Sequence, residues 1–299
     1  MPSYKTHAIH GSKVFPNIDL KTNVNIEDVK AFSVGPDLLI ATNPLVFKLQ
    51  HMFDTRLYFL TLIYLIKQKK LYDNPEVMSY LYGQLNHFVL DIVTHPLIYY
   101  MTEDLPKEHV LDAHGLVEHY IDDYMMEKLN IPNGPYLHKI CINNIELLRL
   151  INELYQKVYR KSNLGIEYSL GISATRLYDL ALRRDKTKIF DFIGEQINLG
   201  DVKYHGNSDL AKPYLNLSGE LWLDPETGDI HYETFDELWK KAIEMAEETI
   251  NDVNMTIYNG KPLNNALILN DISYNTGLPC DKGQNKTYIK SYSSNKEYE

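Results

Sequence analysis

The chain has 299 residues, of which 44% are hydrophobic, and its formal net charge is −10 at pH 7. This composition predicts a globular protein with a large core and excludes a disordered chain. The negative charge argues against a broad surface for nucleic acid or anionic membrane, because phosphates are normally bound by clustered Lys and Arg. Bound metal ions would reverse the charge locally, so a phosphodiester substrate stays compatible with this composition.

Cysteine usage and the apolar segments bear on location. Cys141 and Cys280 are too few for a disulfide framework, so nothing indicates an oxidising compartment. The first residues show no charged region followed by an apolar one, so no signal peptide is expected. The longest apolar stretch, residues 57–66, is too short to span a bilayer and predicts a buried helix. We therefore expect a cytoplasmic protein without a transmembrane segment.

Helical periodicity dominates the chain and strand signals are sparse, which predicts an all-α fold. The expected helices are a segment from His7 to a stop near Pro16, residues 26–32, a helix from Pro44 through His51 that continues or restarts after Asp54, and residues 76–94, 110–129, 144–159, 172–182, 189–197 and 234–253. Residues 1–280 are predicted to form one helical domain, and residues 281–299 a polar tail.

Three local signals refine this pattern. Pro96 lacks a backbone donor and should end or kink its helix directly after His95, which would leave His95 at a helix end. Thr234 and Glu237 have the spacing of a capping box at a helix start. Residues 221–228 have a turn-like pattern, which favours a small hairpin or an extended loop.

Histidines and carboxylates cluster in the first part of the chain, where eight of the eleven histidines lie within 119 residues. Residues four apart on a helix are only about 40° out of alignment, so His87, Asp91 and His95 share one helical face. His114 and Glu118 repeat the spacing on a second helix, and Asp37 and His51 precede both. Imidazole with carboxylate is the ligand mixture that zinc accepts in catalytic sites.

A single histidine on a half-apolar helix is more often a core or surface residue than a metal ligand. Seven residues of ligand type in these registers favour a metal site. The remaining histidines fall outside the pattern. His119 points about 100° away from Glu118, which predicts a position at the surface or behind the ligands. His10 and His109 have no register with the set, and three are isolated and expected to be solvated: His138, His205 and His231.

The order of these residues resembles that of the zinc-dependent phospholipase C family, which includes bacterial α-toxin-type enzymes, and also the catalytic domain of glycosylphosphatidylinositol-specific phospholipase D. The matching motifs are Thr6-His7, Gly35-Pro36-Asp37, His51, the contiguous HxxxDxxxH of residues 87–95 and HxxxE of residues 114–118. Later segments, 214–217, 221–222 and 273–277, also resemble bacterial members. The resemblance implies a multi-helix fold of the phospholipase C and zinc-nuclease type, with two to three zinc ions in a cleft.

The resemblance also implies how the ligands divide. One zinc would be held by Asp37, His51, His87 and Asp91, and a second by His95, His114 and Glu118. Asp91 would bridge to a third zinc, which His7 also binds. Secreted members complete that third site with an N-terminal tryptophan, which this chain lacks, so the site could be empty, completed by water or assisted by His10.

This chemistry predicts a zinc-dependent phosphodiester hydrolase, most like a phospholipase C, whose substrate is a phospholipid or another phosphodiester. Zinc lowers the pKa of bound water to about 7, so that hydroxide is available to attack phosphorus. Asp37 is the candidate catalytic residue that orients or deprotonates this water. Phosphatidylcholine-cleaving relatives have an aromatic residue after this aspartate, whereas here Leu38 follows. The tyrosines that could form another aromatic wall are Tyr58, Tyr64, Tyr99 and Tyr100.

Two other functions remain open at this point. Single-strand-specific zinc nucleases share the resembling fold, but the acidic charge disfavours a stable nucleic-acid partner. A non-catalytic helical interaction protein with structural zinc is the other alternative. Structural zinc sites are closed by four protein ligands, whereas the set of His95, His114 and Glu118 offers three and leaves a position open.

Overall fold

The computed structural model describes residues 4–18, 21–103, 113–132, 136–181, 208–282 and 287–290. Within these ranges the protein is almost entirely helical, and the predicted all-α fold class is confirmed. Among the helices that the structure describes, none combines the length and the apolar character needed to cross a bilayer.

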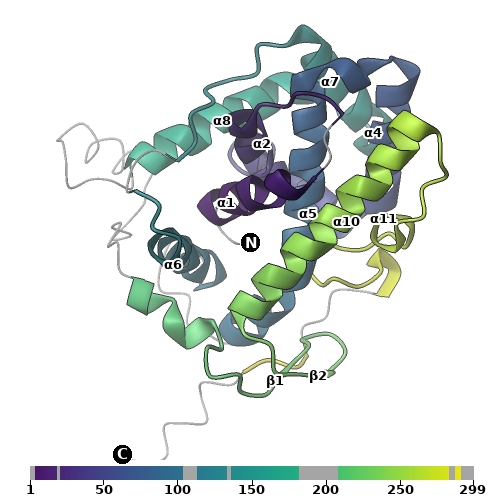
Figure 1. Cartoon of the computed structure of the whole chain (residues 1–299). Coiled ribbons are helices and arrows are strands. Elements are labelled where there is room, and N and C mark those ends of the chain that lie inside the picture. The colour runs from purple at the N-terminus through teal and green to yellow at the C-terminus, as the bar shows by residue number, and fades with distance from the viewer. Residues whose placement is uncertain are drawn as a thin grey trace, which may run out of the picture.

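The long helix α5 (Pro75–Thr102) runs through the middle of the molecule (Figure 1). It begins where the Asn74 side chain accepts hydrogen bonds from the backbone N–H groups of Glu76 and Val77, and Pro75 occupies the first turn. Its side chains are buried almost all the way round, as expected of a helix enclosed by other elements. Helix α10 (Phe235–Asn259) packs along one side of α5, and α1 (Tyr4–Val14) and α2 (Ile26–Phe32) pack along another.

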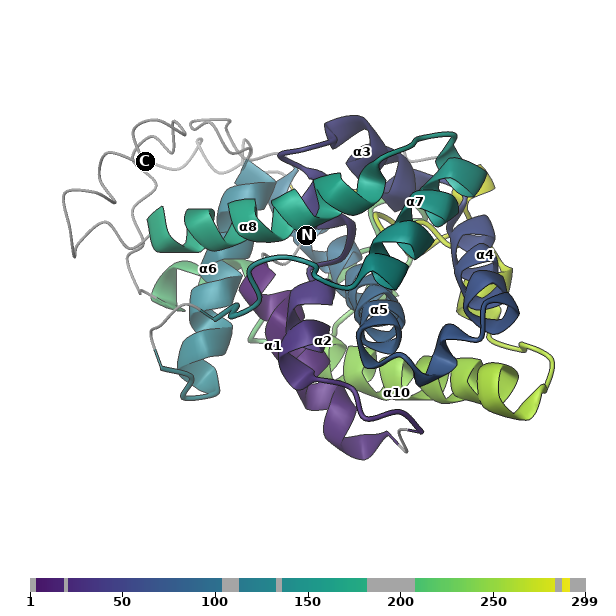
Figure 2. The same ribbon diagram turned by 90° about the horizontal axis from the view of Figure 1, so that it is seen from above.

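The other helices complete a shell around α5. Helix α7 (Ile145–Tyr159) contacts both α4 (Thr55–Gln68) and α8 (Leu164–Ala181), and α6 (Ala113–Lys128) contacts α1 at the side (Figure 2). The remaining helices and 3-10 turns are α3 (Pro44–Met52), α11 (Ala266–Leu269), η1 (Phe15–Asn17), η2 (Gly35–Leu39), η3 (Leu71–Asp73), η5 (Ser208–Leu210), η6 (Lys212–Tyr214) and η7 (Cys280–Lys282).

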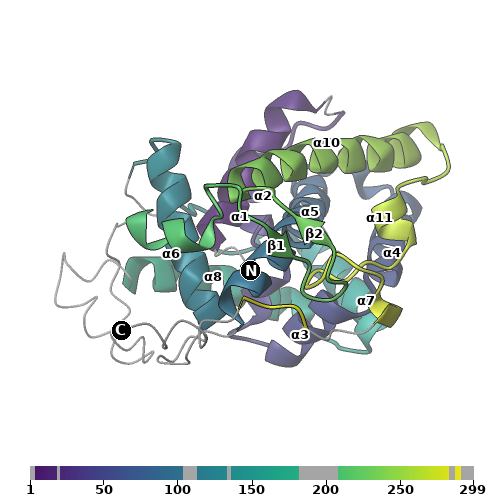
Figure 3. The same cartoon turned by 90° about the horizontal axis from the view of Figure 1, so that it is seen from below.

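The predicted hairpin is present as two short antiparallel strands, β1 (Trp222–Leu223) and β2 (Ile230–His231). They lie at the bottom of the view in Figure 1 and face the viewer in Figure 3, which is seen from below. Trp222 is opposite His231 and their rings stack with centroids 4.4 Å apart. The capping box predicted at Thr234 and Glu237 is also confirmed at the start of α10. That helix continues to Asn259, six residues beyond the expected end at Val253.

The sequence predicted that Pro96 either ends its helix directly after His95 or kinks it there. The predicted end is wrong, because α5 continues to Thr102. Proline inside a helix costs about 3 kcal/mol, so tertiary packing must offset this cost. Leu97, Ile98 and Met101 beyond the proline are all buried in the core. The loop that contains Gly277 packs closely against α5 next to the proline, since a Cβ on Gly277 would lie 2.6 Å from the Ile92 carbonyl oxygen. His95 is therefore an interior residue of the helix.

Helix α8 starts at Leu164, eight residues before the predicted start at Ile172. Its first half contains Gly165 and Gly171, which weaken the helical signal in the sequence. In the fold they allow close packing, because a Cβ on Gly171 would lie 1.9 Å from the Leu38 carbonyl oxygen. The helix predicted over residues 189–197 lies outside the described residues, as do residues 110–112 at the start of the helix predicted over residues 110–129.

Candidate metal centre

Five elements deliver the predicted ligands to one place. His7 lies on α1, Asp37 on η2 and His51 on α3, whereas α5 and α6 supply the others. The residues from these two long helices are His87, Asp91, His95, His114 and Glu118. Three groups form, in each of which the candidate ligand atoms lie within 4.8 Å of one another: Asp37, His51 and His87; His7, His87 and Asp91; and His95, His114 and Glu118. The first two groups share His87.

Asp37, His51 and His87 form the first group. Oδ1 of Asp37 lies 3.2 Å from Nε2 of His51 and 3.8 Å from Nε2 of His87. Gly35, with φ of 63°, makes the turn that presents Asp37, and a Cβ at this position would lie 2.3 Å from the His87 ring. Only glycine allows the backbone to pass so close to the imidazole.

Asp91 lies between the groups. Its Oδ2 is 3.0 Å from Nε2 of His87 and its Oδ1 is 3.2 Å from Nε2 of His7. Oδ1 also lies 3.8 Å from Nε2 of His95, which belongs to the third group. The carboxylate thus contacts ligands of all three groups through its two oxygens, which is the arrangement that a bridging ligand requires.

His95, His114 and Glu118 form the group at the α5–α6 contact. Oε1 of Glu118 lies 2.9 Å from Nε2 of His114 and 3.9 Å from Nε2 of His95. Tyr99, one turn after His95, stacks on the His114 ring with centroids 4.3 Å apart. The stacking fixes the plane of that imidazole.

Hydrogen bonds on the far side of the rings set which nitrogen faces the cluster. The Nδ1–H groups of His51, His87 and His95 donate to the backbone carbonyls of Phe47 at 2.7 Å, Ser33 at 3.1 Å and Tyr274 at 2.7 Å. Since a neutral imidazole carries one proton, Nε2 of each ring is left with a lone pair that points inward. Histidines that bind metals are oriented in this way by their second nitrogen.

His114 is oriented by Thr102 in the same sense. The Thr102 hydroxyl donates its single hydrogen to the Ile98 carbonyl at 2.7 Å, so it can only accept from Nδ1 of His114 at 3.2 Å. Nε2 of His114 consequently also faces the cluster with a lone pair.

The polar atoms of the cluster fit a metal ion because they lack other partners. Within the described residues no hydrogen bond reaches Nε2 of His7, His51, His87 or His95, nor Oδ1 of Asp37 or either oxygen of Asp91. Buried polar atoms are normally satisfied, so a set of this size calls for a bound group. Imidazole nitrogens and carboxylate oxygens are the donor set of zinc.

Burial and neighbouring charges shift the pKa values of the ligands in different directions. Burial lowers the pKa of His87, but the carboxylates of Asp91 and Asp37 outweigh this effect and raise it above its ordinary value. Burial lowers the pKa of His7 to about 4 and that of His95 well below its ordinary value, so both rings are neutral at pH 7. Burial opposes ionisation of Asp91, but the neighbouring rings of His87, His95 and His7 outweigh it and hold the pKa of this carboxyl well below its usual range.

The side chains of the cluster differ in their exposure to solvent. His7, His87, Asp91 and His95 are fully buried, whereas the side chains of Asp37 and His114 are 13% and 15% exposed. Asp37 and His114 are therefore the most exposed side chains of the cluster.

Sequence reasoning missed the residues that hold His7 in place. The carboxylate of Asp122, on α6, accepts hydrogen bonds from the Thr6 backbone N–H at 2.8 Å and from the Thr6 hydroxyl at 2.6 Å. This contact anchors the first turn of α1 beside the cluster. The only available signal was the four-residue step from Glu118 to Asp122 on one helical face.

His10 was left open as an assistant to the third site, and the structure gives it another partner. Its Nδ1–H donates to the side-chain oxygen Oδ1 of Asn86 at 2.7 Å, and the side-chain amide Nδ2 of Asn86 in turn donates to the backbone carbonyl of His7 at 3.4 Å. His10 belongs to none of the three groups within the described residues.

The other histidines stand away from the ligand groups. His119 is half-buried and bonded to the Tyr178 hydroxyl at 2.8 Å, and His138 is exposed. His109 and His205 lie outside the described residues.

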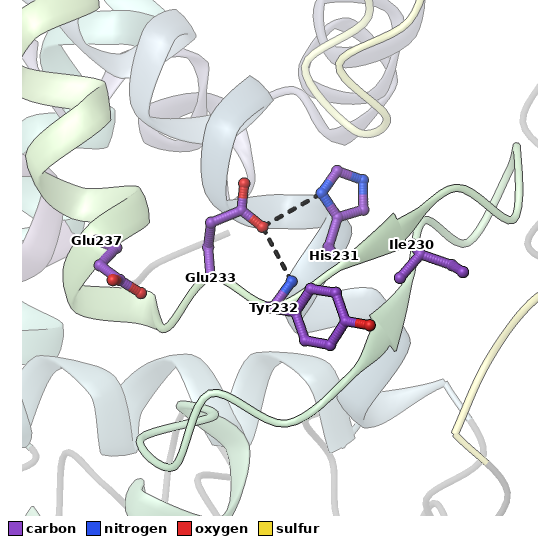
Figure 4. Close-up of a pocket in the computed structure, with 5 residues that line it drawn as sticks. All are labelled: Ile230, His231, Tyr232, Glu233 and Glu237. Carbon is purple, nitrogen blue, oxygen red and sulfur yellow. Dashed lines mark hydrogen bonds and ion pairs between the residues drawn. The ribbon is translucent and has the colours of Figure 1, made fainter.

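A separate hollow of about 370 Å³ is lined by five residues of the hairpin and the start of α10: Ile230, His231, Tyr232, Glu233 and Glu237 (Figure 4). His231 pairs with Glu233 at 3.3 Å, and Glu237 accepts from the Thr234 backbone in the capping box. These polar groups serve local structure, so this hollow is not a second ligand cluster.

Fold and cluster together define an all-α protein with three groups of His, Asp and Glu side chains that could hold metal ions. The family model described as zinc dependent phospholipase C matches residues 6–165, which contain all eight cluster residues. The chain belongs to this family. No curated protein and no solved structure matched the chain.

Proposed function

We propose that the protein is a phospholipase C-type phosphodiesterase, which hydrolyses the bond between phosphorus and the glycerol oxygen of a phospholipid. The observation that carries the proposal is the convergence of eight ligand-type side chains on one largely buried cluster. Membership of the zinc-dependent family supports hydrolase chemistry and a lipid substrate.

The residues would divide the work of holding the metals. Asp37, His51 and His87 would hold one ion with help from Asp91, the group of His95, His114 and Glu118 a second, and His7 with Asp91 a third. When bound, zinc supplies a Lewis acid for the phosphoryl oxygens and lowers the pKa of water.

Asp37 is the proposed catalytic residue. Its partly exposed carboxylate can orient a water molecule and accept its proton, while Asp91 is wholly buried and fixed among the rings. Water adds its oxygen to phosphorus, the bond from phosphorus to the glycerol oxygen breaks, and that oxygen takes up a proton. The products are a diacylglycerol and a phosphorylated head group.

An open position at the second group supports catalysis rather than a structural role. Among the described residues this group has three side-chain ligands, His95, His114 and Glu118. Structural zinc sites normally have four protein ligands, whereas catalytic sites keep one position for water or substrate.

The residue after Asp37 cannot form part of a choline cage in this protein. Leu38 is only 1% exposed and packs in the core, so it offers no surface to a ligand. Tyr58 is fully buried as well, and Tyr64 is 57% exposed on α4. Of the four tyrosines considered, Tyr99 is the one that contacts cluster residues, through its stacking on His114.

The decisive assay uses zinc-loaded protein and mixed phospholipid vesicles, with the water-soluble phosphorylated head group as the measured product. We expect release that depends on zinc and stops with chelator, and loss of release in Asp37→Asn. Exposed His138→Gln is the matched control and should retain activity. Turnover of single-stranded DNA without turnover of lipid would replace the proposal by a nuclease, and no turnover of any diester would leave a structural metal site.

A further inference from the structure

A buried polar network lies beneath the first ligand group. Four tyrosines and two glutamines from five helices share it, and each is 0% exposed: Tyr58, Tyr80, Tyr155, Tyr168, Gln50 and Gln84. Burying hydroxyl and amide groups is unfavourable unless each is hydrogen-bonded, and here they bond to one another.

Gln84 is the centre of the network. Its amide nitrogen donates to the Phe32 carbonyl at 3.2 Å and to the Tyr168 oxygen. Its amide oxygen accepts from the Tyr58 hydroxyl at 3.0 Å and from the Gln50 amide at 3.3 Å. Both donors and both acceptor sites of the carboxamide are used, so its orientation is fixed.

The network ends on backbone that carries the ligands. The Tyr168 hydroxyl donates to the Gly35 carbonyl at 2.6 Å, two residues before Asp37. Gln50 directly precedes His51 and is held on its other side by the Tyr155 hydroxyl, which donates to its amide oxygen at 2.6 Å.

The same network also reaches His87. The Phe32 carbonyl, which accepts from Gln84, belongs to the residue before Ser33, and the Ser33 carbonyl accepts from Nδ1 of His87 at 3.1 Å. All three members of the Asp37, His51 and His87 group thus sit on segments that Gln84 and Tyr168 fix. None of the network bonds described above involves His95, His114 or Glu118.

We propose that Tyr168, acting with Gln84, is a positioning residue that sets the geometry and metal affinity of the Asp37, His51 and His87 group. The inference rests on the proposed zinc function. The turn at Gly35 is confined on two sides. Its backbone passes so close to the His87 ring that a Cβ would lie 2.3 Å from it, and its carbonyl accepts a hydrogen bond from Tyr168. Loss of the hydroxyl would release the turn that presents Asp37.

The test compares two substitutions that each remove one buried hydroxyl and keep the ring. Tyr168→Phe breaks the bond to the Gly35 backbone, whereas Tyr80→Phe breaks side-chain bonds inside the network, including one to Tyr58 at 2.8 Å. Zinc affinity is measured by competition with a chromophoric chelator, and the absorption spectrum of the Co²⁺ protein reports ligand geometry. The measurements are repeated in a His114→Ala background, in which the second group is disabled.

We expect Tyr168→Phe to weaken zinc binding at the first group about 10- to 100-fold, the usual effect of losing a partner behind a ligand, and to change the Co²⁺ spectrum. Tyr80→Phe should leave both unchanged, although both variants lower the melting temperature of the metal-free protein. Equal zinc affinities in the two variants would overturn this inference and leave the proposed function unaffected. Wild-type protein that binds no metal would instead overturn the proposed function, and the inference with it.

Discussion

His87 and Asp91 face each other one turn apart on α5, with 3.0 Å between Nε2 of the imidazole and Oδ2 of the carboxylate. On an exposed helix such a pair would contribute only about 0.2–0.5 kcal/mol. Here both side chains are fully buried, and every ion-pair contact of Asp91 within the described residues is with a histidine ring. A carboxylate buried so deeply needs a positive partner, and a metal ion held by these rings would supply it.

The first prediction concerns metal content. Protein purified without chelator should carry two to three zinc ions, because two of the ligand groups share His87 and Asp91 lies within 3.8 Å of His95 in the third, so that one carboxylate can serve neighbouring ions. Elemental analysis measures the number, and melting before and after chelation should show a large loss of stability. Less than one zinc or iron ion per chain would contradict the metal centre.

The second prediction separates Asp91 from a neighbouring buried residue. Asp91→Asn keeps the size of the side chain but removes the charge that bridges the groups, so at least one zinc should be lost and activity should fall roughly 100-fold or more. His10→Gln, on α1 but outside the ligand groups, should retain its zinc. Equal zinc loss in both variants would show that Asp91 is not a bridge.

The third prediction tests the anchor of α1. Asp122→Asn weakens the acceptor for the Thr6 backbone and hydroxyl, which should cost about 1–2 kcal/mol of stability by analogy with helix caps and lower the occupancy of the site that includes His7. Asp236→Asn is the control, since Asp236 also accepts from an α6 residue, Tyr124, at 3.0 Å but lies on α10. Urea unfolding and zinc analysis would measure both effects, and identical zinc content in the two variants would argue against the anchor.

The fourth prediction concerns pH. Burial lowers the pKa of His10 to about 3 from an ordinary value of 6.5, so the unfolded chain takes up this proton before the folded protein does. The contribution of His10 to stability is complete above pH 6.5 and is lost as the pH falls toward 3. With chelator present, the free energy of unfolding of His10→Gln should depend less steeply on pH over this window. The slope should decrease by up to about 1.4 kcal/mol per pH unit, which is the contribution of one titrating proton. Unfolding curves at several pH values, with exposed His138→Gln as control, would detect the change; parallel curves for His10→Gln and wild type would refute it.

The fifth prediction concerns the head group. Because Leu38 is buried and cannot present a ring face, preference for phosphatidylcholine over other phospholipids should be modest. A cation–π contact at an accessible ring contributes about 0.5–2 kcal/mol, so the free-energy preference for choline should be smaller by about this amount than in an enzyme with an aromatic residue at this position. Relative kcat/KM values on vesicles of single head groups would measure it. A strong choline preference that Tyr99→Leu abolishes would mean that Tyr99 forms the cage.

Local sequence determined much of the fold and of the candidate site. Spacing of four residues placed His87, Asp91 and His95 on one face of α5, as expected, because helical geometry depends only on the residues of that helix. The capping box at Thr234 could also be predicted from the sequence, since its hydrogen bonds join residues three apart.

Tertiary structure decided what local rules could not. Pro96 lies inside α5 because burial of the following turn outweighs the cost of the missing hydrogen bond. Asp122 meets Thr6 across 116 positions of sequence, and Tyr168 meets Gly35 across 133. Neither contact leaves a periodic signal, because each depends on how whole helices pack. The sequence by itself thus determined which residues share a helical face, whereas packing alone brought those faces together and held the ligand segments in register.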